Sequence, residues 1–166
     1  ATNDLLTLLR DQTERMSSMT STLLEMSELR AIPCNDEIEL APLIEEVLAD
    51  LAPLADQKSI ALACRGNSLM NGSDPLMYRM MFNLVENAIR YSRPASTVDV
   101  TVDEEGDQVL VRIEDDGFGI PEQHRDSVFQ PFFRVDKSRS REYGGVGLGL
   151  SLVWEIATLH GGTIEV

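Results

Sequence analysis

The sequence contains little of what marks a disulfide-stabilised or zinc-binding domain. Its two cysteines, Cys34 and Cys64, lie in unrelated contexts and lack the paired spacing of a metal site or a disulfide framework. No apolar run approaches the length that spans a bilayer, and the N-terminus lacks a signal-peptide pattern. We therefore expect a chain of cytosolic character that folds in a reducing compartment.

Positive charge is also scarce. The 166 residues carry 14 Lys and Arg against 28 Asp and Glu, a formal net charge of -14, which argues against nucleic acid or an anionic membrane surface as a partner. Within this acidic chain, basic residues crowd into one short segment, at Arg134, Lys137, Arg139 and Arg141. The cluster suggests an anion to be bound locally, and a solvated basic loop is the alternative that charge alone leaves open.

Glycine and proline are absent between Asp4 and Ala31, and the segment predicts a long helix. Its apolar residues fall on alternating three- and four-residue steps, a heptad seam interrupted by Gln12. Such a helix either packs back on its domain or pairs with other chains. We favour a dimeric bundle, because the later segments form a core without this helix. The seam consists of Leu5, Leu9, Met16, Met19, Leu23 and Met26.

A domain boundary follows this helix. Pro33 cannot continue a helix and Asn35-Asp36 favours a turn, so we divide the chain into residues 1–32 and 33–166. At this length the second part is one core-bearing domain and the first is an accessory element.

Both ends of the sequence look cut, since Ala1 stands in place of a start Met and Gly162–Val166 reads as an unfinished strand. Between them, the patterns predict a short helical segment after Pro121 and a hairpin. The longer predicted elements are helices over Pro42–Gln57, Asp74–Tyr91 and Ser151–His160, strands over Ser59–Arg65, Ser96–Val102 and Gln108–Glu114, and a loop over Gly66–Gly72.

One side of the second of these helices carries an unusual set of polar groups. Asn83 and Asn87 lie one turn apart, and Tyr91 follows one turn later. Glu86 and Arg90 lie on an adjoining strip. This side can present an amide, a carboxylate, a guanidinium and an aromatic ring to one ligand. Asn is a poor helix former, so two on one face favour a function, although exposed surface amides are the simpler alternative.

A carboxylate followed by glycines stands at the end of the second hairpin strand. Asp115 is fixed beside Gly117 and Gly119, whose backbone can take positive φ and approach a ligand closely. A carboxylate accepts hydrogen bonds, so this position can hold an amine. A plain strand-to-loop turn is the alternative, because Asp-Gly is common in turns.

A second glycine-rich run, at Gly145, Gly147 and Gly149, opens the last predicted helix. Its backbone N–H groups would point outward at the positive end of the helix dipole, which favours a phosphate. The run is weak evidence by itself. It lacks the chain position and acidic partner of the dinucleotide fingerprint, and no Lys-Ser/Thr pair of a P-loop follows it.

Four motifs in this order resemble the catalytic ATP-binding domain of two-component sensor histidine kinases, within the superfamily of gyrase, heat-shock chaperone and mismatch-repair ATPases. The resemblance covers about Leu40 to Val166. It implies an α/β (α+β) two-layer sandwich, with a mixed sheet packed on helices, that binds ATP and Mg²⁺. The motifs are Asn83–Ala88 (N box), Asp115–Gly119 (G1 box), Phe129–Arg134 (F box) and Gly145–Gly149 (G2 box).

The resemblance also implies roles for single residues. Asp115 would accept a hydrogen bond from the adenine amine, with Gly117 and Gly119 beneath the base. Asn87 would supply an amide oxygen to Mg²⁺, a hard cation that prefers oxygen ligands. Arg134 would contact the γ-phosphate, within a lid that extends to Val146. The other implied nucleotide contacts are Asn83, Arg90, Tyr91, Ile120, Phe132, Lys137, Arg139, Arg141, Gly145, Val146, Gly147, Leu148 and Gly149.

The first helix similarly resembles the second helix of the kinase dimerisation bundle. The phosphoacceptor motif, a His followed by an acidic residue, is absent, and both histidines, His124 and His160, read as structural or surface residues. The acceptor would therefore lie on a bundle helix outside this sequence. The resemblance implies a homodimer through residues 1–32, a response-regulator receiver domain as a partner, and the cytoplasmic portion of a bacterial inner-membrane sensor.

In a kinase of this kind, catalysis is positioning plus charge neutralisation by Mg²⁺ and Arg134. Glu86 is ambiguous, since it could give base-like assistance or order the Mg²⁺ shell, and the related ATPases use such a carboxylate to activate water. Two other functions stay open. One is an ATP hydrolase that clamps a dimer, against which the F box and bundle-like helix argue. The other is a nucleotide-binding regulatory module without phosphotransfer, which the intact motifs disfavour.

Overall fold

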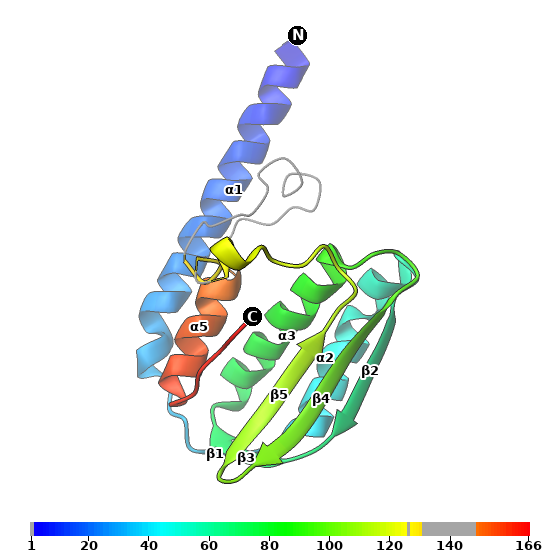
Figure 1. Cartoon of the computed structure of the whole chain (residues 1–166). Coiled ribbons are helices and arrows are strands. Elements are labelled where there is room, and N and C mark those ends of the chain that lie inside the picture. Colours follow the sequence, from blue (N-terminus) through cyan, green and yellow to red (C-terminus); the bar gives the residue numbers. More distant parts are fainter. Residues whose placement is uncertain (1, 126, 131–148) are drawn as a thin grey trace.

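The computed structural model describes residues 2–125, 127–130 and 149–166. The long helices and the hairpin predicted from the sequence are confirmed (Figure 1). The helices are α1 (Thr2–Glu28), η1 (Leu29–Ala31), α2 (Leu40–Asp56), α3 (Asp74–Tyr91), η2 (Glu122–His124) and α5 (Gly149–Leu159). The strands are β1 (Asp36–Glu39), β2 (Ala61–Gly66), β3 (Leu69–Gly72), β4 (Thr97–Glu105) and β5 (Gln108–Glu114).

The domain has two layers, with α2 and α3 on one face of a three-stranded sheet (Figure 1). The strand order is β2-β4-β5, parallel between β2 and β4 and antiparallel between β4 and β5. Along β4, Val98, Val100 and Val102 are buried, whereas Asp99 and Thr101 between them are only partly buried. This alternation gives one apolar face. The predicted two-layer sandwich with a mixed sheet is confirmed.

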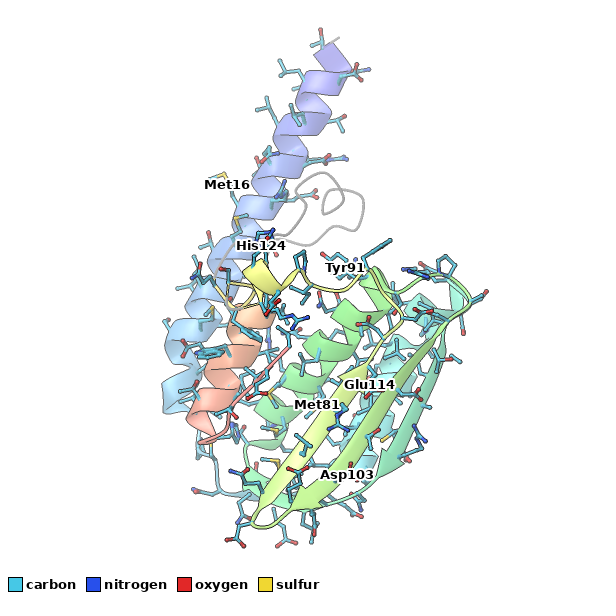
Figure 2. The ribbon with its side chains drawn as sticks, viewed as in Figure 1. Met16, Met81, Tyr91, Asp103, Glu114 and His124 are labelled. Atoms are coloured by element: carbon cyan, nitrogen blue, oxygen red, sulfur yellow. The ribbon has the colours of Figure 1, made fainter. Side chains whose placement is uncertain are left out.

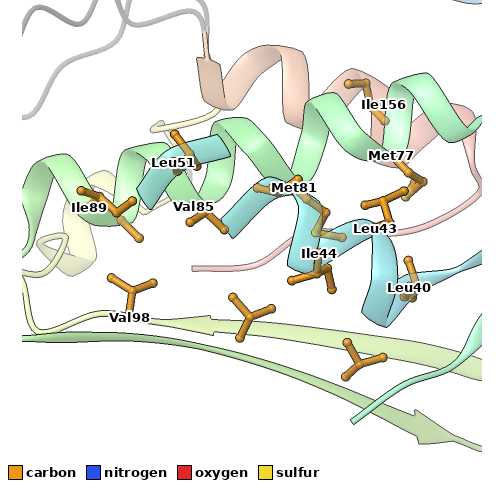
Figure 3. Packing of buried hydrophobic residues seen from close by; sticks show 14 of the residues in the cluster. Leu40, Leu43, Ile44, Leu51, Met77, Met81, Val85, Ile89, Val98 and Ile156 are labelled. Carbon is orange, nitrogen blue, oxygen red and sulfur yellow. The ribbon is translucent and has the colours of Figure 1, made fainter. Parts of the chain in front are cut away.

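The core between the layers consists of one apolar stripe from each helix (Figure 3). Burial of each such side chain stabilises the fold by about 1.5–3 kcal/mol. On the outside of these helices, the Tyr78 hydroxyl donates to the Asp50 carboxylate, and this hydrogen bond is the main cause that raises the pKa of Tyr78 to about 12. The stripes are Leu43, Ile44, Val47 and Leu51 on α2 and Met77, Met81, Val85 and Ile89 on α3.

The prediction of a loop over Gly66–Gly72 is wrong for its second half. Leu69–Gly72 forms β3, which pairs antiparallel with β1 in a separate two-stranded sheet. The pattern does not reveal β3 because Asn71 and Gly72 are typical turn residues, and because its partner lies in a distant segment. Gly72 is required by packing, since a Cβ there would lie 2.5 Å from the ring of His160.

The prediction of a strand over Gly162–Val166 is also wrong. Residues 162–166 are neither strand nor helix, and none of the strands in the described ranges pairs with them, so the ladder that defines a strand is missing. The chain turns instead at His160, whose Nδ1 donates to the Ile156 carbonyl at 2.7 Å. The Nε2 atom accepts from the Ser73 N–H at 3.0 Å, where α3 begins. His160 is therefore structural, as predicted.

Helix α1 packs on the domain at its C-terminal end only. Met26 packs against the core, Glu25 forms an ion pair with Arg79 of α3, and Leu29 of η1, directly after the helix, is buried in the core. Toward its N-terminus the helix extends past the domain (Figure 1). The paired bundle and the boundary at residue 32 stay predictions. Uncovered apolar side chains of this part are Leu5, Leu6, Leu8, Leu9, Met16, Leu23 and Leu24.

Across the described residues, no helix combines the length and the apolar character that crossing a membrane requires.

Candidate functional site

Helix α3 presents the predicted polar residues together. Its N-terminus is capped by Ser73, whose Oγ accepts from the Leu76 N–H at 3.4 Å, and a proline occupies its first turn. Because Val85 and Ile89 face the core, the opposite side is left for polar groups. All five predicted residues on that side are half-buried, at a depth suited to ligand contact. They are Asn83, Glu86, Asn87, Arg90 and Tyr91.

Two of these residues pair with each other. The Arg90 Nε donates to the Glu86 Oε1 at 2.9 Å, and both side chains keep about a third of their surface exposed, 35% for Arg90 and 29% for Glu86. An ion pair one turn apart on a partly solvated helix adds only a few tenths of a kcal/mol. Its consequence is orientation, because it holds the carboxylate along the helix surface.

The predicted amine-binding carboxylate lies directly after β5. Asp115 Oδ1 accepts from the Gly117 N–H at 2.9 Å, a local turn that fixes the carboxylate relative to the following backbone. Loss of surrounding water raises the pKa of Asp115, the hydrogen bond from Gly117 opposes that shift, and the charge of Asp116 adds to it. The residue remains exposed, so an incoming donor can reach it.

The loop after β5 is attached to the C-terminal end of α3. Ser92 and Gly117 form an antiparallel bridge, and the Arg93 N–H donates to the Asp116 carbonyl at 3.0 Å. A Cβ at Gly117 would lie 2.7 Å from the Tyr91 carbonyl oxygen and 2.7 Å from Asp115 Oδ1. Figure 2 shows Tyr91 at this end of the helix. The structure therefore joins the G1 loop to the end of α3, just beyond the helix turns that carry the N box.

The two predicted glycines of this loop have different roles. Gly117 is required for the close approach just described, whereas Gly119 has a φ of 70° and open space around its α-carbon. Gly119 thus serves the turn itself, since such a φ strains other residues. Ile120 follows it and is half-buried.

Much of the predicted phosphate-binding part lies outside the described residues. This applies to Phe132, Arg134, Lys137, Arg139, Arg141, Gly145, Val146, Gly147 and Leu148. Gly149 is described and is the first residue of α5, two positions before the predicted start of this helix at Ser151. Before this gap, the ring of Phe129 contacts Trp154 of α5 with centroids 5.3 Å apart, which places the F-box phenylalanine as a packing residue.

The donor set fits Mg²⁺ only if the ligand contributes. In the described ranges there is no group of three or more His, Cys, Asp or Glu residues that could hold a metal ion. Mg²⁺ needs few protein ligands, however, because it keeps several waters and takes phosphate oxygens. The half-buried amide of Asn87, beside a carboxylate at Glu86, suits that mode of binding.

Sequence reasoning did not single out Lys58. Its Nζ atom donates to the carbonyl oxygens of Ile89, Arg90 and Ser92, at 3.0, 3.0 and 2.6 Å. A lysine in a turn carries no local pattern, so only the three-dimensional structure connects it to the end of α3. The one available signal was that lysine is scarce in this chain, since Lys137 is the other lysine in the sequence.

Comparison with known proteins assigns a family to this geometry. Residues 72–166 match the profile of the family described as histidine kinase-, DNA gyrase B-, and HSP90-like ATPase, and this stretch exceeds half of the chain. The chain belongs to this ATPase family. The resemblance to the ATP-binding domain of sensor histidine kinases is thereby confirmed, and the family profile includes both Asn83–Ala88 and Asp115–Gly119.

The relatives of this ATPase domain are sensor kinases. The sensor-like histidine kinase SenX3 of Mycolicibacterium smegmatis is 32% identical over 161 residues, which covers 93% of this chain and 42% of that protein. The structure of the mycobacterial sensor histidine kinase MprB is 26% identical with a TM-score of 0.69, covering 79% of this chain and 83% of that one. The chain spans less than half the length of SenX3.

A more distant structure supports the fold over nearly the whole chain. Full-length ShkA in complex with AMPPNP is 20% identical with a TM-score of 0.75, and the match covers 98% of this chain and 35% of that one. The matched region therefore includes α1 as well as the two-layer domain.

We expect Gly117→Ala to move the Asp115 loop away from the end of α3, because the added methyl group collides with the Tyr91 carbonyl. Amide resonances of Tyr91, Ser92 and Arg93 should shift in ¹H–¹⁵N spectra, and ATP affinity should fall by at least about tenfold, as for one lost hydrogen bond to a charged group.

Gly106→Ala is the matched control. Gly106 lies in the β4–β5 turn with a φ of 61° and nothing within 4 Å of an added Cβ, so the change should reduce the free energy of unfolding by about 1–2 kcal/mol. Its ATP affinity should equal that of the wild type. Wild-type affinity in Gly117→Ala would contradict the close-approach role.

Proposed function

We propose that this chain is the ATP-binding catalytic part of a protein histidine kinase. It would transfer the γ-phosphate of ATP to a histidine on the dimerisation bundle of the same protein. The observation that carries the proposal is the attachment of the Asp115 loop to the end of α3, since it puts a hydrogen-bond-accepting carboxylate beside the helix that bears Asn83 and Asn87. Family membership supports ATP as the nucleotide.

Asp115 would select the nucleobase. Its carboxylate accepts hydrogen bonds only, so it favours adenine, whose exocyclic group is an amine, over a base with a carbonyl at that place. Gly117 and Gly119 would lie beneath the base, Ile120 would contact it, and Tyr91 would pack near the base or the ribose.

The phosphates would lie along the polar side of α3. Asn83 and Arg90 would face them, and Asn87 would hold Mg²⁺, which when bound neutralises charge on the phosphate oxygens. Arg134 would contact the γ-phosphate. The remaining contacts would come from Phe132, Lys137, Arg139, Arg141 and the helix opening at Gly145, Val146, Gly147, Leu148 and Gly149, where backbone N–H groups favour an anion.

The Glu86 pairing fixes the direction of this carboxylate. Glu86 Oε1 accepts from Arg90, and the second oxygen of a carboxylate can still accept a proton or a hydrogen bond. Glu86 would then act second to Asn87, either in base-like assistance to the acceptor histidine or in ordering the shell of the bound metal. The acceptor histidine would attack in line, so catalysis would be mainly positioning.

The partners follow from α1. Its uncovered leucines near the N-terminus, Leu5 and Leu9 among them, would pair residues 1–32 of two copies in a helical bundle. The bundle would present the acceptor histidine and dock a response-regulator receiver domain. We place residues 33–166 as the catalytic domain within the cytoplasmic portion of a bacterial inner-membrane sensor.

A phosphotransfer assay tests this function against two others. The chain is mixed with labelled ATP, Mg²⁺ and a separate two-helix bundle that carries an acceptor histidine. Acid-labile label on the bundle is the expected result. Free phosphate alone would indicate an ATP hydrolase. ATP binding without either product would indicate a regulatory nucleotide-binding module.

We expect Asp115→Asn to reduce ATP affinity by about ten- to a hundredfold, because a hydrogen bond to a charged group contributes about 1.5–3 kcal/mol. Calorimetric titration measures this change. Since the pKa of Asp115 is raised, wild-type affinity should also begin to fall, on acidification, at a higher pH than an ordinary aspartate would give. Asp103→Asn, an equal change of charge on the far part of β4, is the control (Figure 2). Equal affinities in both variants would remove adenine recognition from Asp115.

We expect Asn87→Ala to abolish the part of ATP affinity that depends on Mg²⁺, because the variant lacks the amide oxygen. Titrations with and without EDTA measure that part directly. Asn71→Ala, at an exposed position of β3, is the control. An unchanged difference between the two titrations in Asn87→Ala would show that Asn87 does not hold the metal.

A further inference from the structure

Lys58 lies in the turn between α2 and β2, far along the chain from the residues assigned above. Its ammonium group donates to the carbonyl oxygens of Ile89, Arg90 and Ser92, at 3.0, 3.0 and 2.6 Å. The last carbonyl groups of a helix lack intrahelical partners and carry the negative end of its dipole. An ammonium has three donors and no acceptor, so one lysine can bind all three of these carbonyl oxygens.

The same turn is also held by backbone hydrogen bonds. The Ala95 N–H donates to the Lys58 carbonyl at 2.9 Å, and the Ala61 N–H donates to the Ser96 carbonyl at 3.0 Å. Ser92, the C-terminal cap of α3, is 2% exposed. Lys58 therefore fixes the chain around the buried Ser92 through both its side chain and its main chain.

This segment is the one that holds the Asp115 loop. Ser92 bridges Gly117, and Arg93 donates to the carbonyl of Asp116. Of the three residues whose carbonyls Lys58 binds, Ser92 itself contacts the G1 loop, and Ile89 and Arg90 precede it in the last turn of α3. A shift of the last turn of α3 would move the Gly117 backbone, which sets the position of Asp115 through a 2.9 Å hydrogen bond.

We propose that Lys58 is a positioning residue for nucleobase recognition. It fixes the end of α3, to which the Asp115 loop is attached. It contacts neither base nor phosphate in this arrangement, so it is not a catalytic residue. The inference rests on the proposed assignment of Asp115 to the nucleobase. It adds to that assignment a residue, Lys58, that keeps the Asp115 loop in position against the helix.

The test compares Lys58→Met, which keeps the aliphatic length and removes the donors, with Gln57→Met at the exposed neighbouring position. Two ligands are titrated with Mg²⁺ present, ATP and inorganic tripolyphosphate, at a temperature well below the unfolding midpoint of each variant. In Lys58→Met, ATP affinity should fall by about tenfold, as for loss of a charge-assisted hydrogen bond, while tripolyphosphate affinity falls by a smaller factor, since Arg90 is the one proposed phosphate contact in the restrained turn. Gln57→Met should match the wild type with both ligands.

A spectroscopic readout separates positioning from general stability. The Gly117 amide resonance, seen in glycine-labelled protein, should shift in Lys58→Met and stay in place in Gln57→Met. A purely structural role would lower the unfolding midpoint and leave both the ATP affinity and the Gly117 resonance unchanged, which would overturn the inference. If Lys58→Met does not fold, Lys58→Gln carries the same test. Failure of the wild type to bind ATP would instead overturn the proposed function.

Discussion

The attachment of the Asp115 loop to the end of α3 is the constraint on which the rest of the site depends. Helix α3 is positioned by its apolar stripe against α2 and the sheet, and the loop is positioned by β5. Neither element alone places a carboxylate beside the polar side of the helix. The Ser92–Gly117 bridge and the Arg93–Asp116 hydrogen bond do so, and they leave no room for a side chain at Gly117.

The charges near this junction are arranged by local geometry rather than by the net charge of -14. Arg90 is paired along the helix with Glu86, and Lys58 is paired with carbonyl groups behind the helix end. Both cations are therefore oriented by the fold. An anionic ligand on the polar side of α3 would meet the guanidinium of Arg90, which is oriented and balanced by Glu86, beside a neutral amide at Asn87.

Most of the fold could be predicted from the sequence, and so could the polar and glycine residues that the structure describes at the end of α3 and in the G1 loop, for different physical reasons. The helices could be predicted from the spacing of their apolar residues. Asp115, Gly117 and Gly119 could be singled out because few backbone conformations require glycine, and two glycines follow this carboxylate. β1, β3 and the segment 162–166 could not be predicted, because strand formation there depends on a distant partner and not on local residues. Lys58 was missed for the same reason, since its partners lie more than thirty positions away.

The strand pairing described above also determines the order in which the domain can assemble. Among the strand pairs of the described residues, only β4 and β5 are consecutive in the chain, whereas β1 pairs with β3 and β2 pairs with β4 across an intervening helix. Closing such long loops is entropically unfavourable and slows folding, so we expect the local hairpin to form before these pairings. Asp115 would then be carried on an early hairpin, yet its connection to Tyr91 and Ser92 would form only when α3 docks. The binding loop would thus reach its final geometry among the last steps, and nucleotide binding would report on complete folding of the domain.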